Sequence, residues 1–176
     1  FQHDKSTFHF AYFHFALNGT DETTYPDVEF ISFATKKASK YEAKTLNIPS
    51  GSDVYQIFNK LGINKKTYII DKIIISKDKF PMLTEEIFTN RTNTIYNLYQ
   101  NKFNIFITNC SERLKATSAD KIVSSLLNIK LGSPILRIER IGQTYHNENI
   151  ELRTSFVQTD EIDYINKQNS TFGDTF

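Results

Sequence analysis

The sequence predicts an α+β domain: a mainly antiparallel sheet with its helices on one side and with internally repeated helix–hairpin units. Three observations point to this fold. A helix–hairpin pattern occurs twice, β-branched strands alternate with short amphipathic helices, and no apolar run reaches the roughly 18 residues of a membrane-spanning helix. With 176 residues, of which 39% are hydrophobic and 23% charged, the chain has the size and composition of one globular domain.

The repeated pattern begins at Leu46 and again at Leu127. Residues Leu46–Ile57 read LNIPSGSDVYQI and residues Leu127–Ile138 read LNIKLGSPILRI, with Leu, Asn, Ile, Gly, Ser and the final Ile at the same offsets. Each copy is typical of a helix end, a glycine-marked corner and a β-strand. A helix and two strands cannot bury a hydrophobic face alone, so the copies are expected to share one sheet and one core. The alternative is that two amphipathic junctions resemble each other by chance.

The elements before and within the first copy follow from local patterns. Phe8–Phe15 is expected to be an aromatic strand and Val28–Phe33 a second strand. Ser39 followed by Glu42 is a capping box that opens the helix ending near Leu46. The first hairpin then breaks at 63–66 and returns along 67–76, after which three side chains are expected to fill the edge of the core: Phe80, Met82 and Leu83.

The second half repeats this order. Asn93 or Thr94 caps a short helix whose apolar residues lie on one face: Ile95, Leu98, Tyr99 and Phe103. Ile105–Ala116 is expected to be a strand, Ser118–Leu127 the second repeat helix, and residues 136–141 with 150–157 the second hairpin. The core is expected to span about residues 8–165, with 166–176 as a frayed polar tail.

Composition excludes several functions. The net charge of +1 gives no bulk electrostatic reason to bind nucleic acid or an anionic membrane. Cys110 is the only cysteine, so no internal disulfide can form. The histidines have no metal-ligand spacing, and there is no phosphate loop or nucleophile elbow, so neither a cofactor nor a metal is expected. Because the chain begins at Phe1, we expect it to be a piece of a longer protein.

Acidic residues interrupt strands that are otherwise apolar. Asp71 and Glu151 lie at nearly equivalent points of the two returning strands, and Glu112 lies in the strand between the repeats. These acids could face solvent or pair with Lys72 or Arg153. Alternatively, they could form a polar lining where the repeats meet, because small-molecule pockets carry a few polar groups in apolar walls.

With these units laid out, the sequence resembles the UTRA domain, the effector-binding part of HutC-type GntR transcription regulators. Leu127–Ile141 (LNIKLGSPILRIERI) and Asn149–Val157 (NIELRTSFV) carry the resemblance most strongly. Leu46–Ile57 matches the family's first copy, and Thr94 with the following residues matches its helix start. The resemblance implies a chorismate-lyase-like fold and a single cytoplasmic effector-binding domain. It also implies a homodimer, a small-molecule metabolite as effector, and DNA contact only through an N-terminal winged-helix domain absent from this chain.

The resemblance also implies candidate effector-binding residues. The family's pocket acids fall on Asp71 and Glu151, and its helix-start hydroxyl falls on Thr94. Its Arg-x-Arg pair, which holds sugar phosphates, falls on Asn59 and Leu61. Two further candidates from the neighbouring strands complete the set: Glu112 and Arg153. A hydroxyl and free N–H groups at a helix start can hold an anion or a polar oxygen.

The alternative function is a chorismate-lyase-like enzyme on the same fold. Such an enzyme needs buried arginines, and at most Arg113, Arg137 and Arg153 are expected to converge. Because the candidate pocket has two acids and lacks the family arginines, we expect a neutral polyol-like or amine-bearing effector rather than a sugar phosphate.

Overall fold

The computed structural model describes residues 14–20 and 23–166. Within these residues the elements follow in this order: β1 (Phe15–Leu17), β2 (Asp27–Lys37), α1 (Lys40–Leu46), β3 (Asp53–Ile63), β4 (Lys66–Ser76), α2 (Glu85–Thr89), α3 (Ile95–Phe103), β5 (Asn109–Ser118), α4 (Lys121–Leu127), β6 (Pro134–Gln143), a 3₁₀ turn (Tyr145–Asn147), β7 (Asn149–Val157) and β8 (Ile162–Tyr164). No helix in the described part of the chain has the length and apolar character needed to span a membrane.

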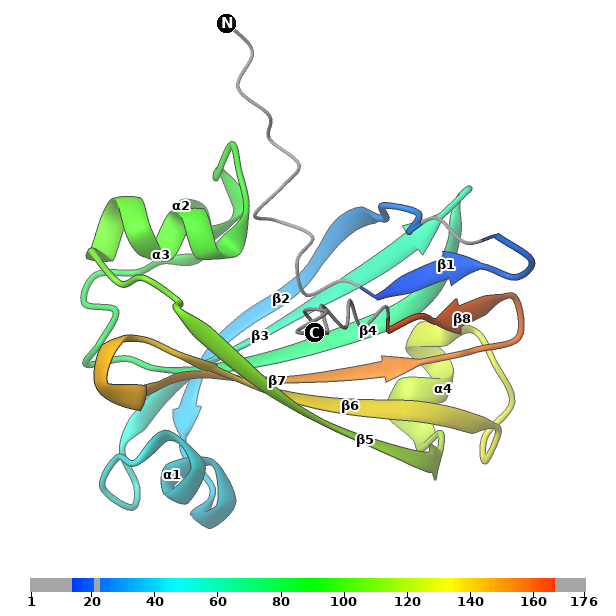
Figure 1. The fold of residues 1–176 in the computed structure, drawn as a ribbon. Coiled ribbons are helices and arrows are strands. Elements are labelled where there is room, and N and C mark those ends of the chain that lie inside the picture. Colours follow the sequence, from blue (N-terminus) through cyan, green and yellow to red (C-terminus); the bar gives the residue numbers. More distant parts are fainter. Residues whose placement is uncertain (1–13, 21–22, 167–176) are drawn as a thin grey trace, which may run out of the picture.

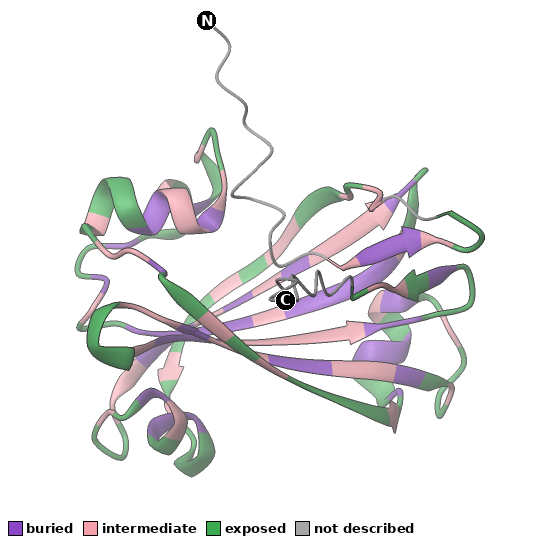
Figure 2. Cartoon of the chain, viewed as in Figure 1, coloured by how far each residue is buried: buried purple, intermediate pink, exposed green. Residues whose placement is uncertain are grey.

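The main sheet is antiparallel throughout, in the order β2-β3-β4-β7-β6-β5 (Figure 1). Strands β1 and β8 form a separate two-stranded ribbon. The predicted α+β fold with a mainly antiparallel sheet is therefore confirmed. Figure 2 shows the burial of side chains concentrated along the central strands, with exposed residues on the outer helix surfaces and at the sheet edges.

The internal repeat is real and one strand longer than predicted. One half is β2-α1-β3-β4, the other is β5-α4-β6-β7, and the halves meet where β4 pairs with β7. Helices α1 and α4 both end at an asparagine in the left-handed conformation, Asn47 (φ 51°) and Asn128 (φ 55°). The following corners place Gly51 (φ 77°) and Gly132 (φ 81°) where a side chain would be strained.

Helices cover both faces of the sheet, which corrects the prediction that they lie on one side. Successive residues of a strand point to opposite faces. On β4, Ile70 and Ile74 pack with the two repeat helices, α4 and α1, whereas Ile73 and Ile75 pack with α2 and α3. The prediction holds for the two repeat helices, which share one face. It fails for α2, which was not recognised in the sequence, and for α3, because the face that α3 covers depends on long-range packing.

Other local predictions have mixed outcomes. The capping box at Ser39 and Glu42 is present, and Thr94 is the residue that caps α3. Phe80 and Leu83 are buried as expected, but Met82 lies in a turn with φ 63° and is 86% exposed. Strand β5 begins at Asn109, later than expected. Of the expected aromatic strand, residues 8–13 lie outside the described residues, as does most of the tail.

A buried acid ties three elements of the first half together. Glu42 of α1 is 5% exposed and accepts hydrogen bonds from the Ser39 backbone (2.8 Å) and Lys36 Nζ of β2 (2.5 Å). Lys72 Nζ of β4 lies 3.7 Å from its other oxygen. Burial opposes ionisation of Glu42, but these partners outweigh it and lower its pKa below the ordinary value.

The Glu42→Gln variant should be less stable than the parent at neutral pH, because the two lysines lose their charged partner. A depressed pKa in the folded state contributes stability above the unfolded-state pKa of about 4.3, and this stability is lost as the pH falls through the folded value. The difference in free energy of unfolding should therefore shrink when urea titrations are repeated from pH 7 down to about pH 3. The exposed Glu85→Gln in α2 is the control, and a pH-independent difference for Glu42→Gln would contradict the assignment.

Candidate effector-binding cavity

A cavity of about 230 Å³ lies on the α3 side of the sheet, bounded by the central strands, the start of α3 and the β1–β8 ribbon. Apolar side chains such as Leu61, Ile69 and Ile138 form part of its wall. Its polar and charged lining residues are His14, Asn59, Asp71, Arg91, Asn93, Thr94, Tyr96, Glu112, Arg140, Arg153, Ser155 and Tyr164. Apolar walls with a few convergent polar groups are the usual composition of a small-molecule site.

The residues singled out from the sequence gather at this cavity with one exception. Six of them line it: Asn59, Leu61, Asp71, Thr94, Glu112 and Arg153. The exception is Glu151, which is fully buried behind the lining. These positions agree with their selection as candidates, and their binding role remains a prediction.

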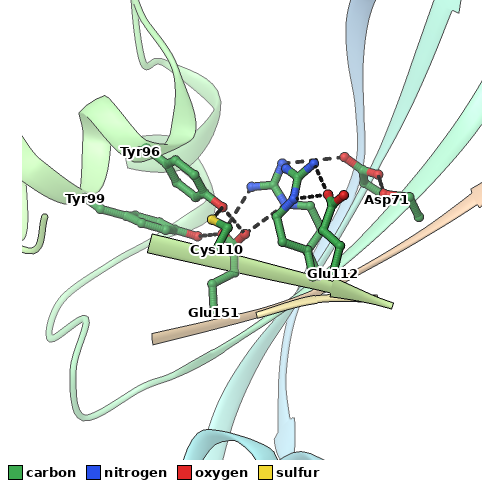
Figure 3. Close-up of polar contacts among 9 residues, drawn as sticks. Asp71, Tyr96, Tyr99, Cys110, Glu112 and Glu151 are labelled. Carbon is green, nitrogen blue, oxygen red and sulfur yellow. Dashed lines mark hydrogen bonds and ion pairs between the residues drawn. The ribbon is translucent and has the colours of Figure 1, made fainter. Parts of the chain in front are cut away.

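Glu151 is the centre of a buried polar network (Figure 3). It accepts hydrogen bonds from Tyr99 OH (2.6 Å) and Tyr96 OH (3.1 Å), both on α3. Arg153, two residues along β7, donates to it through Nε (2.8 Å) and Nη2 (3.1 Å). The Arg153 guanidinium also lies 5.4 Å from the centre of the Tyr96 ring. Glu151 therefore does not face the cavity. It holds Arg153, which does face the cavity, in a fixed position.

Electrostatics in this network keep its members in defined protonation states. Burial and the neighbouring Glu151 raise the pKa of Tyr99 well above its ordinary value, so the phenol remains a hydrogen-bond donor. Burial alone would lower the pKa of Arg153, but the charge of Glu151 reverses this and raises it well above the ordinary value. The arginine is therefore a permanent cation.

Asp71 and Asn59 face each other across neighbouring strands. Asp71 on β4 is the register partner of Asn59 on β3, so the two side chains project side by side on the cavity face. Asp71 accepts a hydrogen bond from Ser155 Oγ (2.5 Å), and Nη1 of Arg153 lies 3.6 Å from its second oxygen. Asn59 is 1% exposed, and its Oδ1 has no hydrogen-bond partner among the described residues.

A second ion pair closes the opposite wall. Arg140 of β6 donates through Nε to Glu112 of β5 (2.8 Å), and the same carboxylate accepts from Tyr164 OH of β8 (3.1 Å). Glu112 thus joins the edge of the main sheet to the β1–β8 ribbon. The sequence left open that Glu112 pairs with a basic residue such as Lys72 or Arg153. Glu112 does pair with a basic residue, but that residue is Arg140.

Three arginines line the cavity, and two of them were not foreseen. Of the arginines expected to converge, Arg113 and Arg137 do not line it, because their positions on β5 and β6 point to the other face. Arg91 and Arg140 line it instead. The parity of the second hairpin, in which Arg140 is the register partner of Arg153, is the sequence signal that could have identified Arg140. Arg91 lies in the connection before α3, whose path no local pattern predicts.

The start of α3 faces the cavity through Thr94 and Asn93. Thr94 Oγ1 accepts from the Asn97 N–H (2.9 Å), and Asn93 Oδ1 accepts from the Thr94 N–H (2.8 Å). The first amides of a helix have no acceptor within the helix, and they carry a partial positive charge. This end of the cavity is therefore electropositive even before Arg91 is counted.

The fold is an antiparallel-sheet domain with a cavity on its α3 side, where polar groups converge between apolar walls. Comparison with known proteins places it more closely. The UTRA domain family matches residues 22–163, so the chain belongs to the UTRA domain family.

Solved structures share the fold. The ligand-binding domain of a protein described as a GntR-family transcriptional regulator from Bordetella bronchiseptica superimposes with a TM-score of 0.83 at 26% identity, covering 89% of this chain and 96% of that one. The effector domain of PhnF from Mycobacterium smegmatis has the same fold, with a TM-score of 0.67 at 15% identity over 78% of this chain and 82% of its own.

Among curated proteins, the chain is similar to the probable fructoselysine utilization operon transcriptional repressor of Escherichia coli K12. The two are 24% identical over 117 residues, which are 66% of this chain and 47% of the repressor. The matched region thus spans about half the length of that relative. The chain is an effector-binding regulatory domain of the type found in GntR-family regulators.

Replacing Glu151 by Gln should destabilise the domain strongly, by on the order of 3 kcal/mol, because the buried Arg153 loses its paired charge. The matched control is Glu148→Gln, since Glu148 is an exposed acid that pairs with Lys79 at the surface, where such pairs contribute about 0–1 kcal/mol. Urea unfolding of both variants measures the difference. Equal losses for the two variants would show that Glu151 does not organise the core.

Proposed function

We propose that this chain is the effector-binding part of a bacterial transcription regulator, in which a metabolite bound in the cavity changes DNA binding by a domain outside the chain. The observation that carries the proposal is the cavity itself, which brings six of seven candidate residues together in a domain of the UTRA family. The names of the relatives agree, since they are transcriptional regulators or a repressor.

The near-zero net charge of the chain supports the proposal that effector binding and DNA binding belong to different domains. With 21 basic and 20 acidic residues there is almost no net charge to attract phosphates. The relative from E. coli is about twice as long as the region it shares with this chain. We therefore infer that DNA is contacted by a winged-helix domain elsewhere in a cytoplasmic protein, and that this chain supplies effector binding and self-association.

A lyase activity on the same fold is not favoured by any observation. Neutralising a dicarboxylate substrate requires arginines that are free to pair with it. Arg140 and Arg153 line the cavity but already pair with Glu112 and Glu151. Of the three cavity arginines, only Arg91 makes no ion pair with a described residue, and one cation is too few for two carboxylates.

The first test is whether the cavity binds a metabolite. In a thermal-shift panel of sugars, sugar phosphates, amino acids and organic acids at millimolar concentration, at least one compound should stabilise the domain, by roughly 2.7 kcal/mol at 100 times its Kd. Val28→Trp, at the 48% exposed rim of the cavity, should abolish the effect. Ile122→Trp, which is 64% exposed on α4 and away from the cavity, should not.

The same compound should then change the operator affinity of the complete gene product in a mobility-shift titration. An unchanged DNA affinity at saturating ligand would contradict the proposal. Stabilisation that survives Val28→Trp would place the binding site elsewhere on the domain.

We also expect the isolated chain to be a homodimer. Strands β2 and β5 are the two edges of the main sheet, and exposed edges are available for pairing or contact between chains. The sequence FHFAYF at residues 8–13 is strongly aromatic, and contiguous apolar patches are rare on the surfaces of monomers. Sedimentation equilibrium at tens of micromolar should give twice the chain mass of 20.4 kDa, and a monomer mass would contradict this.

A further inference from the structure

Negative and positive groups lie on different walls of the cavity, and this arrangement indicates the chemical class of effector that the cavity can hold. The inference rests on the proposed function and adds the chemical class of the ligand. Two of the charged groups cancel each other, because Arg140 and Glu112 form a close pair (2.7 Å). The remaining charges are those of the wall around Asp71 and of the wall around Arg91.

The wall around Asp71 offers hydrogen-bond acceptors and negative charge. Arg153 is shared by two acids, and it is bound closely to Glu151 (2.8 and 3.1 Å) but only loosely to Asp71 (3.6 Å). Asp71 is 4% exposed, and its carboxylate can accept further hydrogen bonds besides the one from Ser155. The negative charge of Asp71 is therefore incompletely compensated inside the protein.

Beside Asp71 lies a buried acceptor that nothing in the described chain satisfies. Oδ1 of Asn59 has no hydrogen-bond partner there, and the Asn59 side chain is almost completely buried. Buried polar groups in native structures are nearly always paired, so such an orphan needs an explanation. A ligand ammonium supplies one, because it has three N–H donors that can reach the Asn59 oxygen and the Asp71 carboxylate together.

The wall around Arg91 has the opposite character. The Arg91 guanidinium donates to the Phe88 carbonyl oxygen (2.6 Å) and lies 4.4 Å from the centre of the Phe88 ring, but it makes no ion pair with any described residue. Burial lowers the pKa of Arg91, yet arginine stays protonated in proteins. Asn93 and Thr94 line the cavity next to it at the start of the nine-residue helix α3, whose first amides favour an anion.

We propose that the effector is a small zwitterion of the amino-acid type, with its ammonium on Asn59 and Asp71 and its carboxylate on Arg91 and the first turn of α3. A neutral polyol would leave Arg91 without an opposite charge and Asp71 with only its loose pair to Arg153. A phosphate dianion would meet a single free arginine and the incompletely compensated Asp71, while the positions of the family's Arg-x-Arg pair hold Asn59 and Leu61. A simple amine would leave Arg91 unpaired.

The test uses free L-amino acids and amino-sugar acids as probes on the intact chain, measured by thermal shift and calorimetry. The tightest zwitterion is then compared with two capped forms of the same compound, its N-acetyl derivative without the ammonium and its carboxamide without the carboxylate. Each capped form should bind at least about tenfold more weakly, since hydrogen bonds to charged groups are worth about a factor of ten or more in affinity.

Two variants assign the ends. Arg91→Gln should weaken the zwitterion but leave the affinity for the carboxamide unchanged, and Asp71→Asn should weaken the zwitterion but not the N-acetyl form. The matched controls are the exposed Arg113→Gln and Asp78→Asn, which should bind all three compounds like the parent. Unfolding temperatures without ligand verify that each variant is folded.

The inference is overturned if no zwitterion stabilises the chain, if the capped forms bind as tightly as the parent compound, or if a neutral sugar or sugar phosphate binds best. A neutral or phosphorylated ligand whose binding is lost in Val28→Trp would overturn only the zwitterion and leave the proposed function standing. The proposed function fails separately, when a cavity ligand of any charge leaves DNA affinity unchanged.

Discussion

The buried ion pair between Glu151 and Arg153 is the interaction on which the rest of the site depends. Both residues lie on β7, one of the two central strands, and Glu151 is fully buried. The two tyrosines of α3 donate to Glu151, so they hold the helix against the sheet while the arginine reaches toward Asp71 on β4. A carboxylate in this position is stable only because it is completely surrounded by donors, and the same donors fix where the helix starts.

The repeated architecture explains how opposite charges arise in one cavity. Asn59 and Asp71 are register partners in the first hairpin, and Arg140 and Arg153 are register partners at the corresponding place of the second. The two halves therefore provide the same backbone geometry but different side chains: an amide and a carboxylate from the first half, and two arginines paired with glutamates from the second. A duplicated unit with identical side chains would make a symmetric lining, whereas the lining of this cavity is asymmetric.

The sequence predicted what local patterns and strand parity determine. The repeat was visible because helix ends at Asn47 and Asn128 and corners at Gly51 and Gly132 need particular backbone angles, which few residues adopt. Alternation along the strands brought Asp71 and Arg153 to one face. The position of Arg91, the outward turn at Met82 and the face covered by α3 depend on contacts between distant segments, which no local pattern records. Glu151 stood out in the sequence as an acid in an apolar strand and was predicted to bind the effector, but the packing of Tyr96 and Tyr99 places it behind the cavity wall.

The β1–β8 ribbon links what the cavity contains to the path of the chain on either side of it. Each strand of the ribbon has three residues, too few to be stable as an isolated pair, so its position depends on what it packs against. Phe15 and Tyr164, which contact each other edge to face, are both ribbon residues and cavity residues. The first and last described strands therefore both contribute side chains to the cavity wall. Any segment joined to β1 is attached to a short two-stranded wall of the cavity. A shift of this ribbon would therefore change the direction in which that segment leaves the domain.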